Sequence, residues 1–160
     1  MNANDILHYG HLTVKQTLTA LPENAWETPG VVGVWSVRDV IAHLASFELL
    51  LVDALRSIRG ETPTPVLDRF VELGNAAFND AEVARRQGLS AAEVWAEYEE
   101  TAVQAQTLLA QIPTALRRQT GALPWYGPEY DLEDFIAYSN YGHKREHCAQ
   151  IAVFRDRTQQ

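Results

Sequence analysis

Apolar residues recur along this chain three and four positions apart, and no stretch alternates in the manner of a β-strand. This pattern predicts helices over about residues 4–21, 37–59, 66–87, 91–112 and 132–157. The second of these is apolar on most sides, which is typical of a central helix. The remaining helices carry one apolar stripe each, as expected for helices packed around a shared core.

Polar residues at the predicted helix starts support these boundaries. Ser36 and Ser90 are expected N-caps, with Asp39 and Glu93 three positions later to complete capping boxes. The last helix is expected to begin at Asp131. Proline and glycine mark the expected ends, at Pro22, Gly60, Gly88 and Pro113.

The connections between most of these helices are short, and the longest irregular stretch covers residues 113–130. Residues 1–160 are therefore expected to form a single all-α domain. We expect an antiparallel four-helix bundle with one additional intervening helical segment.

The charge of the chain narrows the range of partners. The formal net charge is -8, with only 13 Lys and Arg in 160 residues. Tracking a nucleic acid or an anionic membrane requires clustered basic residues, so neither is an expected partner. The most apolar stretch, residues 40–55, contains His43, Glu48 and Asp53 and is too short and polar to span a bilayer.

The expected location is the cytoplasm. The N-terminus lacks the basic and apolar regions of a secretion signal. Cys148 is the single cysteine and cannot form an internal disulfide, which suits a reducing compartment. We interpret Cys148 as a packing residue and not as a nucleophile.

His143 and His147 lie one helical turn apart on the face predicted to point into the bundle. Two imidazoles at this spacing can bind one metal ion, although such a pair also occurs by chance. His43 projects from an apolar face of the central helix, where a lone histidine is more often a hydrogen-bonded core residue. Together the three histidines predict a site for one divalent ion with positions left open for water or substrate. Zinc or nickel suits such a nitrogen-rich site best.

Other residues are candidates for supporting roles. His11 lies on the inward stripe of the first helix and is expected to line a pocket or to serve as a fourth ligand. Trp35, Trp125 and Tyr126 are candidates for the wall of a substrate pocket, or equally for aromatic plugs at the end of the bundle. Glu146 is a candidate proton shuttle or partner of a ligating histidine, or a partner of Lys144 or Arg145 in a salt bridge at the rim.

Three segments resemble a known family. The run WSVRDVIAH from Trp35 to His43 and the run HKREHCAQI from His143 to Ile151 resemble the two histidine motifs of the DinB/YfiT-like superfamily. The stretch from Phe78 to Ser90 is similar to relatives of the N-terminal domain of mycothiol-dependent maleylpyruvate isomerase. The chain also resembles colibactin self-resistance-type proteins.

This resemblance implies an up-up-down-down bundle with a long crossover, a metal on His43, His143 and His147, and a homodimer. It also implies enzymes that use a low-molecular-weight thiol, such as mycothiol or bacillithiol, and hydrolases. The expected function is therefore metal-dependent S-transfer or hydrolysis of a small electrophilic substrate. The alternative is a non-catalytic protein that sequesters a metabolite or responds to stress and holds a structural ion. The sequence does not decide whether the protein is an enzyme.

Overall fold

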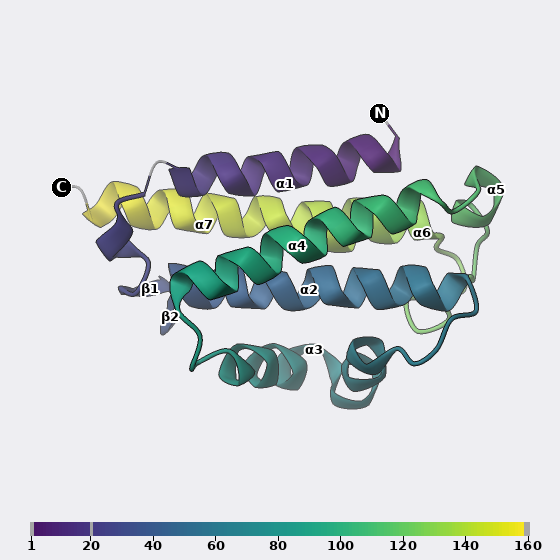
Figure 1. Ribbon diagram of the computed structural model, residues 1–160, viewed down its shortest axis with the longest axis horizontal. Helices are drawn as coiled ribbons and strands as arrows, with labels where there is room; N and C mark the ends of the chain where they lie inside the picture. The colour runs from purple at the N-terminus through teal and green to yellow at the C-terminus, as the bar shows by residue number, and fades with distance from the viewer. Residues whose placement is uncertain (1, 20, 159–160) are drawn as a thin grey trace.

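Four long helices of the described chain form the bundle in a computed structural model, which describes residues 2–19 and 21–158 (Figure 1). These are α1 (Ala3–Thr19), α2 (Val37–Ile58), α4 (Ala91–Ala110) and α7 (His143–Thr158). Helices α2 and α4 run in one direction, and α1 and α7 run in the other. Helix α3 (Pro65–Arg85) is the long crossover between the parallel pair α2 and α4. The prediction of an all-α bundle is confirmed. The expected up-up-down-down order is wrong, because in chain order the four helices run up, down, down and up (Figure 1).

The predicted helix starts are also confirmed. Ser36 and Asp39 form a reciprocal capping box, in which each side chain accepts a backbone N–H of the other residue. Ser90 and Glu93 form the same arrangement at the start of α4. The first helix was predicted to continue through position 20 to residue 21. Position 20 lies outside the described residues.

A small β-hairpin precedes α2, where the sequence pattern predicts only a loop. Strand β1 (Pro29–Val32) pairs antiparallel with β2 (Trp35–Ser36), with Val32 opposite Trp35, and the short helix η1 (Glu23–Ala25) precedes it. These strands are too short to show the alternation by which a strand is recognised. The hairpin holds Trp35 at the start of α2.

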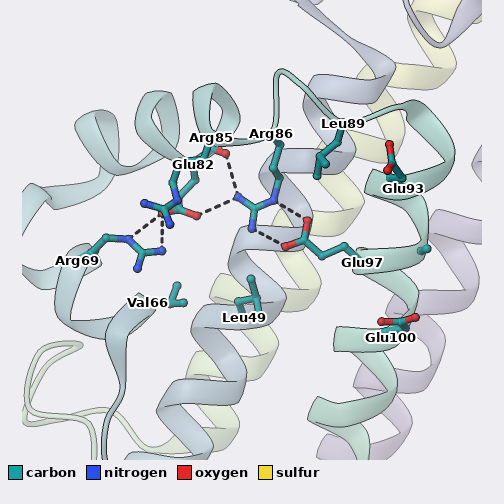
Figure 2. A pocket seen from close by; sticks show the side chains of 11 residues that line it. Leu49, Val66, Arg69, Glu82, Arg85, Arg86, Leu89, Glu93, Glu97 and Glu100 are labelled. Carbon is teal, nitrogen blue, oxygen red and sulfur yellow. Dashed lines mark hydrogen bonds and ion pairs between the residues drawn. The ribbon is translucent and has the colours of Figure 1, made fainter.

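Helix α3 is kinked at Gly74, whose backbone has φ 71° and ψ 169°. Glycine takes this conformation without the steric penalty of a Cβ atom. A chain of ion pairs spans the kink and continues to α4 (Figure 2). The Glu82 carboxylate accepts hydrogen bonds from Arg69 at 2.7 Å and Arg86 at 2.9 Å, and Arg86 also pairs with Glu97 at 2.7 Å. We call these four residues the arginine–glutamate clamp.

The predicted last helix is divided into three parts. Asp131 caps α6 (Leu132–Phe135), as expected, and a π-helical segment, η2 (Ile136–Gly142), leads into α7. The continuous α-helix expected over these residues is therefore interrupted, because each π turn holds more residues than an α turn. The predicted inward positions Leu132 and Ile136 are nevertheless buried. The short helix α5 (Thr114–Arg117) lies in the stretch that was expected to be irregular.

The apolar core is divided between the two ends of the bundle, and a smaller cluster lies under α3. At one end, Val40, Leu44 and Ile151 are buried beside the hairpin. At the other, Leu7 and Leu55 are buried with side chains of α4 and α6. In the described part of the chain, no helix has the length and apolar character needed to cross a membrane.

Candidate metal centre

His43 lies within the first two turns of α2 and is 2% exposed. The rings of Trp35 and Phe47 flank its imidazole, with ring centroids 5.1 and 4.9 Å away. The hairpin supplies Trp35, and Phe47 lies one turn further along α2. These contacts hold the imidazole in one orientation.

His143 and His147 lie one turn apart on α7 and face His43. The Nε2 atom of His143 is 2.8 Å from Nε2 of His43 and 2.9 Å from Nε2 of His147. One nitrogen from each ring lies within 4.8 Å of the others. The structure therefore brings together the three histidines that the sequence predicts as ligands.

Hydrogen bonds among the rings do not account for this arrangement. Nε2 of a neutral imidazole offers either one hydrogen or one lone pair, directed in the plane of the ring. Nε2 of His143 therefore cannot make two well-aligned hydrogen bonds to the other two nitrogens. A cation can accept all three lone pairs, at about 2.1 Å from each nitrogen for zinc. The three histidines could hold one metal ion.

The histidines are neutral at neutral pH, as metal ligands must be. Burial and the adjacent His143 and His147 lower the pKa of His43 to about 2. Burial, with His147 and Lys144 nearby, lowers the pKa of His143 to about 3. Burial also lowers the pKa of His147, although Gln150 and Glu146 oppose this shift.

Gln150 fixes the tautomer of His147. Nδ1 of His147 lies 2.7 Å from Oε1 of Gln150, an atom that can only accept, so Nδ1 carries the hydrogen. The lone pair then remains on Nε2, which faces the other two histidines. Partners of this kind orient ligating histidines in metal sites. Sequence reasoning missed this role, although the spacing of three residues from His147 was a signal for it.

Glu146 is exposed and reaches the site only through Gln150. The amide nitrogen of Gln150 donates to Oε1 of Glu146 at 3.4 Å. The described residues show no ion pair between Glu146 and Lys144 or Arg145. A role as proton shuttle stays a prediction.

Lys144 is buried instead, and its partner is Glu48 of α2. Their charged atoms are 2.7 Å apart, and Asn140 bonds to both side chains, at 2.8 Å to Glu48 and 3.1 Å to Lys144. This pair joins α2 to the last helix beside the histidines. Sequence reasoning did not predict this pair, because the two partners lie far apart along the chain and a lysine is rarely buried.

The other predicted pocket residues lie in separate places. Trp35 packs on His43, whereas Trp125 and Tyr126 line a cavity that also contacts Phe47. His11 lies over Tyr98, with ring centroids 5.6 Å apart, and lines a different cavity between α1 and α4. His11 is outside the group of potential ligands found among the described residues.

Cys148 is buried in the core against α1, as expected for a packing residue. Burial raises the pKa of its thiol, which disfavours the reactive thiolate.

The fold and the three histidines define the class of protein: a four-helix bundle with a candidate metal site between its central and last helices. The sequence profile of the DinB superfamily matches residues 11–151. The chain therefore belongs to the DinB superfamily. Comparison with curated proteins and with solved structures yields no significant match.

Proposed function

We propose that this protein is a metal-dependent enzyme in which His43, His143 and His147 hold one divalent ion. The observation that carries the proposal is the convergence of three imidazoles, two buried and one half-buried. Nε2 of His143 lies 2.8 Å from Nε2 of His43 and 2.9 Å from Nε2 of His147. Membership of the DinB superfamily agrees with metal binding.

The donor set favours a catalytic site over a closed structural one. Among the described residues, the group of potential ligands holds three histidines and no cysteine or carboxylate. Structural zinc sites have four protein ligands, whereas catalytic sites have three and keep a position open. Imidazole nitrogens suit zinc or nickel.

The residues around the site prepare it for reaction. Gln150 keeps the hydrogen of His147 on Nδ1, and Trp35 and Phe47 exclude water from the sides of His43. A divalent ion supplies Lewis acidity there, lowering the pKa of water or a thiol to near neutrality and polarising an electrophile. We propose a low-molecular-weight thiol or water as the nucleophile and a small electrophile as the substrate.

One observation favours a second function. The ligands come from α2 and α7, so an ion would tie these two helices together in a protein that has no turnover. Such a protein would sequester a metabolite or respond to stress.

Chelation separates the two functions. Conjugation of bacillithiol, mycothiol or glutathione to 1-chloro-2,4-dinitrobenzene is measured before and after treatment with EDTA, together with a thermal melt. An enzyme loses turnover and regains it with Zn²⁺ or Ni²⁺, while the bundle stays folded. A melt that collapses on chelation, with no turnover at any stage, would support the structural ion.

A further inference from the structure

A cavity of about 300 Å³ lies next to the candidate metal centre. Phe47 forms a wall between the two, since its ring centroid is 4.5 Å from that of His143. The cavity is enclosed by α2, α3, the stretch after α5 and the segment that leads into α7. Its lining is Phe47, Leu50, Phe70, Asn75, Trp125, Tyr126, Phe135 and Ser139. A molecule bound in this cavity would lie one ring away from the histidines.

The walls are mainly aromatic and meet edge to face. The ring of Trp125 is 5.7 Å from that of Phe70 at 75°, and 5.2 Å from that of Phe135 at 82°. Such walls present both ring faces and ring edges, which attract the edges and faces of another ring. The volume lies at the small end of the range for ligand sites, which suits a molecule of one or two rings.

The polar groups of the cavity are neutral. Ser139 donates to the Tyr126 hydroxyl at 3.1 Å, which leaves the hydroxyl hydrogen of Tyr126 available to an acceptor. The Trp125 Nε1 atom is buried and has no acceptor among the described residues. No lining residue carries a charge. A carboxylate or phosphate would therefore lose its hydration without gaining a cation, whereas a neutral oxygen would gain a donor.

Helix α3 is fixed in the position that closes the cavity. The Asp53 carboxylate accepts the backbone N–H of Val66 at 2.7 Å and anchors the start of α3. The arginine–glutamate clamp joins the segments before and after the Gly74 kink (Figure 2). Phe70 and Phe78, from the two sides of the kink, consequently pack on Phe47, at 6.2 and 5.8 Å between ring centroids. The cavity is thus formed before any ligand arrives.

We propose that this cavity binds the aromatic ring of a neutral, oxygen-bearing small molecule and so places it beside the metal centre. The inference deepens the proposed function by naming the substrate class. Binding of a ring in the cavity does not depend on the proposed function. Only the statement that the ring belongs to the substrate rests on that function.

Binding of 4-fluorophenol, followed by ¹⁹F NMR titration of the metal-loaded protein, tests the proposal. We expect saturable binding at one site, with fluorobenzene bound about three- to tenfold more weakly because it lacks the hydrogen-bonding oxygen. The double variant Trp125→Phe/Tyr126→Phe keeps an aromatic ring at both positions, a smaller one at 125, and removes both donors. It should bind the two probes equally, and a phenol preference that survives in it would overturn the assignment of these donors.

A second pair of variants locates the ring. Asn75 is exposed at the edge of the cavity, so Asn75→Trp should fill the cavity and weaken 4-fluorophenol binding at least about tenfold, as expected for a lost ring site. Asp80→Trp is the matched control, exposed on the same helix but outside the lining, and should bind as the wild type does. Unsaturable binding, or equal binding by the Asn75→Trp variant and the wild type, would overturn the proposal.

The metal content of each sample separates this inference from the proposed function. Protein that holds its metal but does not bind 4-fluorophenol contradicts the cavity proposal alone. Protein that binds 4-fluorophenol and holds no metal contradicts the proposed function and leaves the ring site in place.

Discussion

The arginine–glutamate clamp and the histidine cluster are both polar and largely buried, but only the clamp provides partners for its own polar atoms. In the clamp, the oxygens of Glu82 accept from Arg69 and Arg86, and the remaining N–H groups of Arg86 bond to Glu97. Each charge there has a partner of opposite sign. The histidines have no such partner, because their Nε2 atoms all point toward one another.

This difference in pairing indicates a separate role for each cluster. A network that pairs all its charges fixes the fold, in this case the shape of α3. A group of converging acceptors is unfavourable on its own and becomes favourable only with a cation. The predictions below break the ion pair beside the histidines, the clamp or the histidine cluster, starting with the largest expected effect.

Removing one partner of the buried pair beside the histidines should destabilise the protein most. In Lys144→Met, Glu48 remains buried without its cation, and we expect the free energy of unfolding to fall by about 3–5 kcal/mol. Urea denaturation measures this change. The double variant Lys144→Met/Glu48→Leu removes both charges and should recover most of the loss. If the double variant were less stable than the single one, this account of the pair would be wrong.

Breaking the clamp should cost less. Glu82→Gln loses the charge-assisted bonds to Arg69 and Arg86, and we expect a loss of about 1.5–3 kcal/mol in the free energy of unfolding. Glu100→Gln, at an exposed residue lining the cavity next to the clamp, is the control and should have little effect.

The effect of Glu82→Gln should also depend on pH. Burial alone would raise the pKa of Glu82, but hydrogen bonds and charges from Arg86 and Arg69 outweigh it and hold the pKa below the usual value of a glutamate. The stabilisation is therefore complete above the pKa of the unfolded state and is lost as the pH falls through the lower folded-state pKa. The stabilities of the wild type and the variant should converge in acid. A difference that stays constant at low pH would contradict this assignment.

Within the histidine cluster, the support from Gln150 is open to a direct test. Gln150→Leu leaves Nδ1 of His147 without its acceptor and should weaken zinc binding about 10- to 100-fold. Competition with a chromogenic chelator measures the affinity. Gln150→Glu retains an acceptor and is the matched control, and Glu146→Gln should have a smaller effect than Gln150→Leu. Unchanged affinity in the Gln150→Leu variant would show that the tautomer needs no such support.

The smallest effect is expected at His11. His11→Ala should leave zinc affinity unchanged, because His11 lies outside the group of ligands and lines a separate cavity. A marked loss of zinc in the same chelator competition would identify His11 as a fourth ligand and favour the structural ion.

The sequence predicted those parts of the fold that depend on local chemistry. The capping boxes at Ser36 and Ser90 and the end of α2 before Gly60 follow from residues a few positions apart. The kink at Gly74 and the π segment before His143 were not predicted. Both lie within stretches whose apolar spacing resembles a regular helix, and packing against other helices determines their shape.

The same distinction holds for the candidate site. The spacing of His143 and His147 and the apolar face around His43 were sufficient to predict that these three histidines lie together. The face of α1 that carries His11 was correctly predicted to point inward. The apolar spacing of one helix, however, does not determine which other helix that face contacts. The buried pair of Lys144 and Glu48 depends on two distant segments, so only the assembled bundle shows it.

The metal content of untagged protein tests the central claim most directly. Elemental analysis of the purified wild type, His143→Ala and His8→Ala compares a residue that contacts both other histidines with an exposed histidine outside the group. The account predicts roughly one divalent ion per chain in the wild type and in His8→Ala, and almost none in His143→Ala. Equal metal content in the wild type and His143→Ala, whether one ion or none, would contradict it.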